Sequence, residues 1–409
     1  MNRTDLARQH AHDASRDAHA LTGAWAVAAV AGMIGALFAG STVLTPLYVI
    51  YKQEMGFSQI TLTLIYAVYV CGNLAALFVF GRLSDRLGRR RVALPAIGIA
   101  IVSALVFIAA QGVAALYVAR ILSGLGIGIG VGTGTAWLAE LIANGNKARA
   151  TTIATSTNFL GLALGALAAG LLADDAPAPL VLPFVVYIVA LGVAAALIAR
   201  TRETVAPRAG GIREMPRPKL SVPRAIRAQF VAPAVTGFGA MALAGFFAAL
   251  SPSILQQTLH EQSHAVAGAV FFALAFVASV SIVLMQHVPS RAAMLWSLGL
   301  MLPSVALIVL AQALAAMPLM LLGAVTCGIA GGLGYRGSLQ EVNEIAPADR
   351  RAEVVSSYFV CCFIGNAVPV IGVGVIATFA GSTVASLVFA AVIALFALVA
   401  LGFGIRYSR

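Results

Sequence analysis

The residues with the clearest chemical potential form a charged loop between two long apolar runs. The loop reads Gly81-Arg-Leu-Ser-Asp85-Arg86-Leu-Gly88-Arg89-Arg90-Arg91. One carboxylate stands among five arginines, and a second carboxylate, Glu140, ends a later apolar run. Ion pairs between these groups are the expected chemistry. Asp85 also lies where the N-terminal N–H groups of a helix favour an anion.

Two arginines, Arg120 and Arg336, lie inside apolar runs rather than at their ends. A charged side chain at the centre of a bilayer costs about 2.5–3.5 kcal/mol on insertion scales, so such residues are functional candidates by default. For Arg120 two roles stay open. It could couple to proton movement through the membrane potential and a neighbouring acid or water, or it could hydrogen-bond to backbone carbonyls of the first apolar run.

Arg336 shares one face of a helix with Gln340 and Asn343. A polar stripe of this kind is costly against lipid, so it must face protein or a water-filled cavity. Two roles stay open here as well. The stripe could form a cationic, hydrogen-bonding wall for a substrate, or Arg336 could pair structurally with Glu341 or Glu344.

Smaller polar residues inside apolar runs complete the candidates for a substrate cavity. Tyr66, Tyr69 and Asn73 share a helical face at positions i, i+3 and i+7. The other candidates stand singly or in the first apolar run: Thr42, Thr45, Tyr48, Asn158 and Asn366. Each of these residues could instead hold two helices together through a hydrogen bond.

The composition of the 409 residues indicates what must position these groups. Apolar residues make up 60% and charged residues 10%, whereas a soluble domain has about 45–50% and about 25%. Ordinary soluble enzymes, disordered chains and coiled coils are excluded. We predict an all-α membrane protein with twelve spans of roughly 20 residues or more, at 24–51, 60–80, 92–112, 113–142, 150–172, 178–199, 230–256, 265–287, 292–313, 317–342, 353–380 and 382–405.

The basic residues predict the orientation of these spans. Of 26 Lys and Arg residues, only Lys52 falls in the loops on one side, and only Arg120 and Arg336 fall inside spans. The other 23 lie in the two tails and in the loops on the opposite side. Because basic loops stay in the cytoplasm, both termini are predicted to be cytoplasmic, in a bacterial inner membrane crossed many times. The positive charge therefore indicates orientation and not a nucleic-acid partner.

The spans divide into two groups of six. The stretch 200–229 is rich in Arg, Pro and Gly, and we interpret it as a solvated cytoplasmic linker. It separates residues 24–199 from residues 230–409, and residues 1–23 form a polar tail. An offset of 204 residues aligns Glu140 with Glu344 and also aligns four further pairs, which suggests a duplicated six-span unit.

Three motifs resemble those of the major facilitator superfamily, and the resemblance covers essentially the whole chain. The charged loop matches the family signature Gly-x-x-x-Asp-Arg-x-Gly-Arg-Arg at Gly81, Asp85, Arg86, Gly88, Arg89 and Arg90. The run Arg120-Ile-Leu-Ser-Gly124-Leu-Gly126 is similar to the family's Arg-x-x-x-Gly-x-Gly. Gly161-x-x-x-Gly165-Ala166-x-x-Ala169-Gly170 is similar to its antiporter motif, with Ala in place of one Pro and one Gly.

The resemblance implies a fold and a mechanism. The fold would be two pseudo-symmetric six-helix bundles that rock about a central site, with spans one, four, seven and ten facing the cavity. Asp85, the arginines beside it and Glu140 would form a charge latch. The latch would hold the outward-open state and would release when a carboxylate is protonated or the helices separate. The alternative for the same charges is anchoring of the loop alone.

The distribution of acids and histidines narrows the function. None of the 15 Asp and Glu residues lies in the middle of a span, whereas family antiporters for cationic drugs carry a carboxylate in span one. Neutral or anionic substrates are therefore favoured. His260 and His264 could hold a metal at i, i+4 spacing, but we interpret them as part of a solvated loop. The glycines of span four do not fit a nucleotide-binding spacing, and we predict neither a cofactor nor a metal.

We predict a monomeric secondary transporter in the lipid bilayer that exports small organic compounds, either drugs or metabolites, with protons as the coupling ion. The alternative within transport is uptake of an organic anion or a sugar-like solute by proton symport or facilitated diffusion. A membrane-embedded protease would need its catalytic pair at membrane depth, which His260 and His264 do not provide. A receptor or scaffold would not need Asp85.

Overall fold

The computed structural model describes residues 21–80, 83–142, 146–205 and 220–407. Almost all of these residues are helical. In a long apolar segment that meets lipid, only a helix satisfies every backbone N–H and C=O group from within the segment. Within the described residues, twelve helices or helix pairs are long and apolar enough to cross a membrane. They match the twelve predicted spans, and the protein is a multi-pass, all-α membrane protein.

The N-terminal half contains the first six spans. The first span is divided into α2 (Gly23–Thr42) and α3 (Leu44–Met55), next to Pro46, which has no N–H to donate to the carbonyl of Thr42. The remaining elements are α4 (Gln59–Ala75), the π-helical η1 (Ala76–Phe80), the short α5 (Ser84–Leu87), α6 (Arg89–Ile108), α7 (Val113–Leu141), α8 (Lys147–Asp175) and α9 (Leu182–Ala199).

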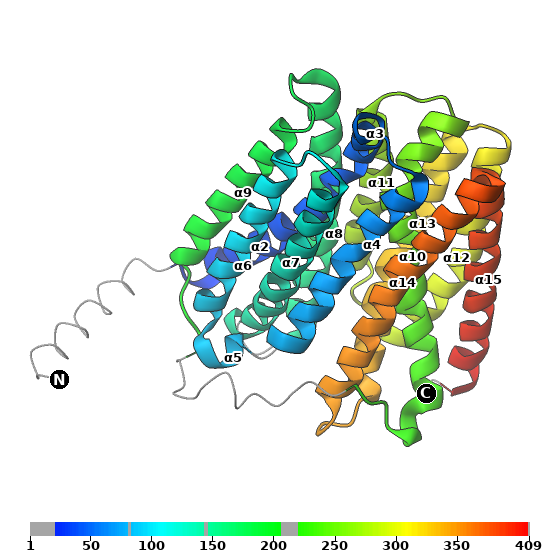
Figure 1. The fold of residues 1–409 in the computed structure, drawn as a ribbon. Helices are drawn as coiled ribbons and strands as arrows, with labels where there is room; N and C mark the ends of the chain where they lie inside the picture. Colours follow the sequence, from blue (N-terminus) through cyan, green and yellow to red (C-terminus); the bar gives the residue numbers. More distant parts are fainter. Residues whose placement is uncertain (1–20, 81–82, 143–145, 206–219, 408–409) are drawn as a thin grey trace, which may run out of the picture.

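The C-terminal half contains the other six spans. Its helices are η4 (Arg224–Ile226), α10 (Arg227–Thr258), α11 (His264–Leu284), α12 (Ser290–Ala313), α13 (Met317–Ile345), α14 (Arg351–Ala380) and α15 (Ser382–Tyr407). Figure 1 shows the two halves side by side. They meet where α8 packs against α11 and where α4 packs against α14.

The molecule has two ends, the linker end and the distal end. The linker end carries α5, residues 200–205 and the start of α10, at the bottom of Figure 1. The distal end carries the turn after α3, the end of α8 and the start of α11.

At the distal end the two halves are joined by one carboxylate. Asp174, at the end of α8, accepts hydrogen bonds from the Ser263 hydroxyl at 2.6 Å and from the backbone N–H groups of His264 and Ala265 at 2.9 Å each. It also lies 2.7 Å from Nδ1 of His264. A carboxylate of one half thus caps the first turn of α11 in the other half, where the helix dipole favours an anion. His264 was interpreted as part of a solvated loop, and that was wrong, because the helix already starts at this residue.

Replacing Asp174 by Ala should loosen the distal end, because the capped N–H groups of α11 lose their acceptor. Loss of a cap costs about 0.5–2 kcal/mol, which corresponds to roughly a 2–30-fold shift of the equilibrium toward separated halves. Double electron–electron resonance between spin labels at Pro177→Cys and Leu314→Cys, in a background without native cysteines, should show longer distances. Asp175→Ala, which changes the adjacent exposed carboxylate, is the matched control. Equal distributions in the two variants would contradict this account of the closure.

Candidate functional site

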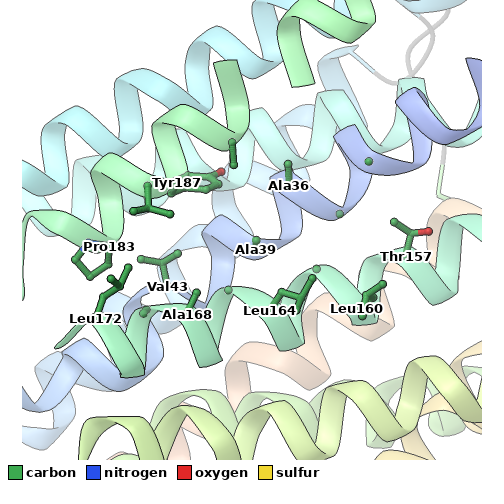
Figure 2. Close-up of a pocket in the computed structure, with 17 residues that line it drawn as sticks. Ala36, Ala39, Val43, Thr157, Leu160, Leu164, Ala168, Leu172, Pro183 and Tyr187 are labelled. Atoms are coloured by element: carbon green, nitrogen blue, oxygen red, sulfur yellow. The ribbon is translucent and has the colours of Figure 1, made fainter. Parts of the chain in front are cut away.

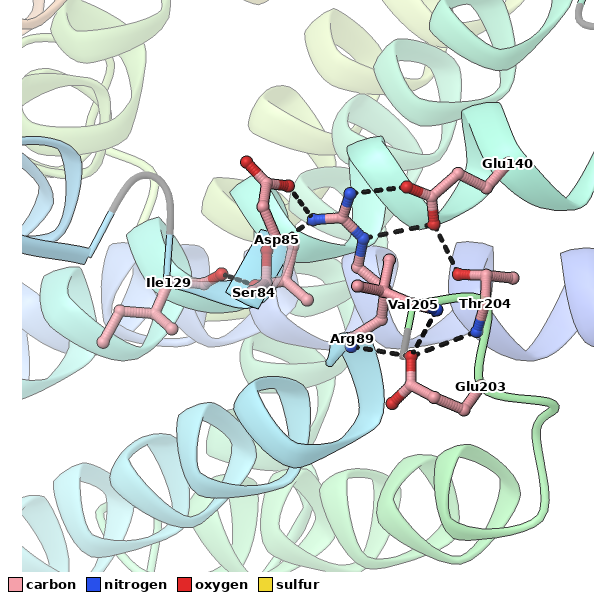
Figure 3. Close-up of polar contacts among 9 residues, drawn as sticks. Ser84, Asp85, Arg89, Ile129, Glu140, Glu203, Thr204 and Val205 are labelled. Carbon is pink, nitrogen blue, oxygen red and sulfur yellow. Dashed lines mark hydrogen bonds and ion pairs between the residues drawn. The ribbon is translucent and has the colours of Figure 1, made fainter. Parts of the chain in front are cut away.

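The charged loop forms a compact ion-pair cluster centred on Arg89 at the linker end (Figure 3). The guanidinium group lies 2.6 Å from Asp85 through Nη1, and its Nη2 and Nε atoms lie 2.5 and 3.2 Å from the two carboxylate oxygens of Glu140. Nη1 also donates to the Ser84 hydroxyl at 2.6 Å. The Arg89 side chain is only 6% exposed, so these contacts compensate a nearly buried charge. The ion pairs expected from the sequence are present.

The other residues of the signature lie around this cluster. Arg90 points to the neighbouring helix, where it donates to the carbonyl of Ala199 at 3.3 Å. Arg86 follows Asp85 in the short helix α5. Gly81 falls outside the described residues.

A segment that the sequence assigned to the solvated linker completes the cluster. Glu203 accepts hydrogen bonds from the backbone N–H groups of Arg89 at 2.8 Å and Arg90 at 2.9 Å, so it caps the start of α6. The Thr204 hydroxyl donates to Glu140, and the Trp137 indole N–H donates to the carbonyl of Arg202 at 3.2 Å. Residues 200–205 are therefore packed onto the N-terminal half, and the prediction of a solvated linker was wrong for this stretch.

Gly88 is required by the geometry of this cap. Its φ angle of +101° is one that residues with a side chain rarely adopt, and a Cβ atom there would lie 2.7 Å from Oε2 of Glu203. Glycine thus lets α5 turn into α6 while Glu203 approaches the new helix start. We refer to Asp85, Arg89, Glu140, Glu203 and Thr204 as the latch cluster.

All members of the latch cluster belong to the N-terminal half or to the segment fastened to it. The cluster is intact although Asp174 closes the distal end. None of the contacts described above joins one half to the other, and the role of these ion pairs in holding an outward-open state stays a prediction.

The second half has a counterpart of this cluster in which no arginine stands between the carboxylates. The Ser290 hydroxyl at the start of α12 lies 3.1 Å from Glu341 and 3.2 Å from Glu344, which is the repeat partner of Glu140. A hydroxyl thus replaces the guanidinium group of Arg89. The matching loop of the second half, residues 286–291, contains neither an acid nor a glycine.

Arg120 lies at the centre of a second cluster, inside the membrane-spanning part. It is fully buried, and it donates to the carbonyl of Ser41 at 3.1 Å and to the hydroxyl of Tyr48 at 2.7 Å. Its guanidinium carbon lies 5.3–5.8 Å from the ring centroids of Tyr48, Tyr66 and Tyr69, within the range of cation–π attraction. Its Nε atom has no partner. None of the ion pairs found among the described residues involves Arg120.

Close packing of α4 and α7 brings the tyrosines to Arg120. A Cβ atom on Gly124 of α7 would collide with the backbone carbonyl of Tyr69, and one on Gly72 of α4 would collide with that of Ile121. The two helices therefore approach at a pair of glycines, one turn away from Arg120. Gly124 of span four thus serves close helix packing.

The Arg120 cluster also connects the two halves. The Tyr66 hydroxyl donates to Oδ1 of Asn366 on α14 at 2.7 Å, and the Asn366 amide donates to the hydroxyl of Tyr69. The structure thus brings together five of the predicted cavity and coupling residues: Tyr48, Tyr66, Tyr69, Arg120 and Asn366. Both hydrogen bonds lie in the interface that must change when the halves rock.

The remaining cavity candidates are more dispersed. Thr42 donates to the carbonyl of Leu162 at 2.7 Å and so ties α2 to α8. Asn73 is buried beside Gly128, and Gln340 is half-buried. The buried oxygens Oδ1 of Asn158 and Oγ1 of Thr45 have no hydrogen-bond partner. A buried oxygen without a hydrogen-bond partner costs free energy, so these two atoms are suited to accept a hydrogen bond from a ligand or a water molecule.

Arg336 makes different contacts from those expected. It donates to the backbone carbonyls of Met285 at 2.7 Å, Gln286 at 2.6 Å and Val288 at 3.0 Å, just after α11 ends. These carbonyls belong to the turn that follows the helix, in which Met285 also accepts from the backbone N–H of Val288 at 3.0 Å, so the guanidinium group fastens this turn. The pairing with Glu341 or Glu344 is not found, and the side chain is occupied by backbone rather than free to line a cavity. Asn343 likewise donates to Leu339 of its own helix.

The antiporter-like motif of span five packs α8 against α2. Cβ atoms on Gly161 and Gly165 would collide with the backbone of Gly35 and Ala39. An apolar groove of about 330 Å³ opens beside this contact, between α2, α8 and α9 (Figure 2). Tyr187 and Thr157 provide its hydroxyl groups. None of the predicted coupling or cavity residues lines this groove.

Gly88→Ala should destabilise the protein. The added methyl group forces both a strained φ angle and displacement of Glu203, at a cost of about 1–3 kcal/mol. Chemical unfolding in detergent should show this loss. Gly98→Ala in α6 is the control, because a Cβ atom there meets nothing within 4 Å and the backbone is helical. A stability loss no larger than that of the control would show that Glu203 adapts freely.

Comparisons with known proteins agree with this architecture. No curated protein matches the chain in sequence. The crystal structure of the human organic anion transporter MFSD10 (TETRAN) is similar, with 16% identity, a TM-score of 0.65 and coverage of 92% of this chain and 99% of that one. A bacterial homologue of the human lysosomal transporter Spinster, in an inward-facing and unoccupied conformation, is 15% identical, with a TM-score of 0.70 and coverage of 93% and 97%.

These identities are low, so the two structures establish the fold alone. The family assignment comes from the sequence. The model of the Major Facilitator Superfamily matches residues 30–370, which is most of the chain and includes both clusters described above. The protein therefore belongs to the major facilitator superfamily, a family of secondary transporters of small solutes.

Proposed function

We propose that the protein exports small organic compounds in exchange for protons, and that its substrates are anionic or neutral rather than lipophilic cations. The observation that carries this proposal is the Arg120 cluster. It presents a buried guanidinium group without a carboxylate, ringed by three tyrosines, at the interface of the two halves.

The charge balance of this cluster favours an anion. Burial of a charge is costly unless the charge is paired, and Arg120 has only a carbonyl, a hydroxyl and ring faces as partners. A bound carboxylate or similar group would supply the missing counter-charge and could accept from the unpartnered Nε atom. A cationic substrate would meet repulsion at the same place.

The same cluster suggests how binding would be linked to movement. Tyr66 and Tyr69 place their ring faces against Arg120, and their hydroxyl groups are hydrogen-bonded to Asn366 of the other half. A substrate that takes over these hydroxyl groups would weaken a link between the halves. In alternating access, the site is then exposed to one side of the membrane at a time.

We place the linker end in the cytoplasm of a bacterial cell, with both termini on that side of the inner membrane. The support is the concentration of Lys and Arg residues at this end, as the positive-inside rule requires. Protonation of Glu140 would remove one of the two carboxylates that hold Arg89, which makes the latch cluster our candidate for proton coupling. We expect the protein to act as a monomer.

The alternative is uptake of an organic anion or a sugar-like solute, by proton symport or facilitated diffusion. It would use the same Arg120 cluster. Protons and compound move in opposite directions in exchange and in the same direction in symport, and facilitated diffusion moves no protons. Liposomes with a pH-sensitive dye inside, together with a measurement of compound movement, can distinguish these cases.

Arg120→Gln should weaken binding and transport of anionic compounds by roughly 10–100-fold, because a hydrogen bond to a charged group contributes about 1.5–3 kcal/mol. Arg120→Lys, which keeps the charge, should retain part of the preference. Initial transport rates of a compound panel that contains matched acids, amides and amines would measure this. Unchanged selectivity between acids and amides in Arg120→Gln would overturn the proposed substrate class.

Glu140→Gln should abolish compound-dependent proton flux while leaving downhill movement of the compound in place. The amide cannot take up a proton and holds Arg89 only as a neutral acceptor. Glu344→Gln is the control, since the repeat partner of Glu140 contacts Ser290 and not an arginine. Proton flux that persists in Glu140→Gln would exclude the latch cluster as the coupling site.

A further inference from the structure

A second cavity lies at the distal end, between the two halves. It has a volume of about 380 Å³, within the size range of small-molecule sites. Its walls come from the distal ends of five helices: α3 and α4 of the N-terminal half, and α10, α14 and α15 of the C-terminal half. It contains none of the residues of the Arg120 cluster. We call it the distal cavity.

The distal cavity has one charged side chain, Lys52 of α3. The other polar groups that line it are neutral: Ser58, Gln59, Ser253, Gln257, Thr378, Ser382 and Ser386. Lys52 donates to Oε1 of Gln59 at 2.8 Å. An ammonium group has three N–H donors, so this bond leaves two for other acceptors. Hydroxyl and amide groups can donate to the same anion from the opposite wall.

We infer that the distal cavity is a second binding site for a small organic anion that carries a carboxylate. Because the lining includes one cation and no acidic side chain, an anion fits it better than a cation or an apolar molecule. The statement that this anion is also the transported compound rests on the proposed function. The existence of the site rests only on the cavity and Lys52.

The position of the cavity predicts what occupancy does. Lys52 belongs to one half, and Ser253 and Gln257 belong to the other, so a bound anion bridges the halves. It therefore adds to the closure that Asp174 makes at the same end. An anion that binds from the distal side stabilises the closed distal end and acts as a brake on its opening.

The test is equilibrium dialysis of the purified full-length protein against radiolabelled benzoate, with benzamide as the neutral analogue. Wild type should bind two benzoates per chain, one at the Arg120 cluster and one in the distal cavity. Lys52→Gln should weaken one of the two sites by about 10-fold or more, and Lys52→Arg should largely restore it. Gln53→Ala, next to Lys52 but not part of the lining, is the control.

This experiment tests the proposals for the two sites independently. Loss of one benzoate in Arg120→Gln and of the other in Lys52→Gln supports both proposals. If Lys52→Gln binds benzoate as wild type does, or if wild type binds none, the distal site is excluded. Binding that depends on Lys52 and not on Arg120 keeps the distal site and removes the support for the proposed substrate class.

The effect of the bound anion on the opening of the distal end is measured separately. Benzoate should shorten the distances between labels at Pro177→Cys and Leu314→Cys in the Asp174→Ala variant, and it should fail to do so when Lys52→Gln is added. Equal distance distributions with and without benzoate, in a variant that dialysis shows to be occupied, would refute bridging.

Discussion

A cation inside a membrane protein must find its partners in the protein, and this requirement determines much of the arrangement around α4, α7 and α11. Arg120 meets it with one carbonyl, one hydroxyl and the faces of three tyrosine rings. Arg336 meets it with three carbonyls at a helix end. Neither uses a carboxylate. In both residues the Nε atom has no partner. The difference is that Arg336 donates to backbone carbonyls, whereas Arg120 stands among polar side chains that also reach the other half.

The two halves place different chemical groups at corresponding positions of the linker end. In the first half, a buried guanidinium group holds two carboxylates, and a third carboxylate from residue 203 caps the next helix. In the second half, one serine hydroxyl stands between two glutamates. The first arrangement pairs its carboxylates with a buried cation, whereas the second joins its carboxylates through a neutral hydroxyl.

The fold and the ion pairs of Arg89 with Asp85 and Glu140 could be predicted from the sequence because their signals are local. Runs of apolar residues predict spans directly, and Asp85, Arg89 and Glu140 stand in a motif with regular spacing. Glu203 has no such signal, since a single acid in a basic linker gains meaning only when the end of α9 lies beside the start of α6. Asp174 and His264 are 90 residues apart and belong to different halves. The contacts of Arg336 were not predicted because the nearby glutamates are visible in the sequence, whereas the backbone carbonyls of the turn after a neighbouring helix are not.

The attachment of residues 200–205 changes where the first half of the molecule ends. The N-terminal half is complete only when Glu203 and Thr204 have joined Arg89 and Glu140, which is several residues after the last turn of α9. During synthesis, the ion pairs of the first half would therefore gain their final partners only after the sixth span has been made. A division of the chain into two co-expressed fragments accordingly belongs after Val205. A cut after Ala199 would place Glu203, which caps α6, in the fragment that contains the C-terminal half.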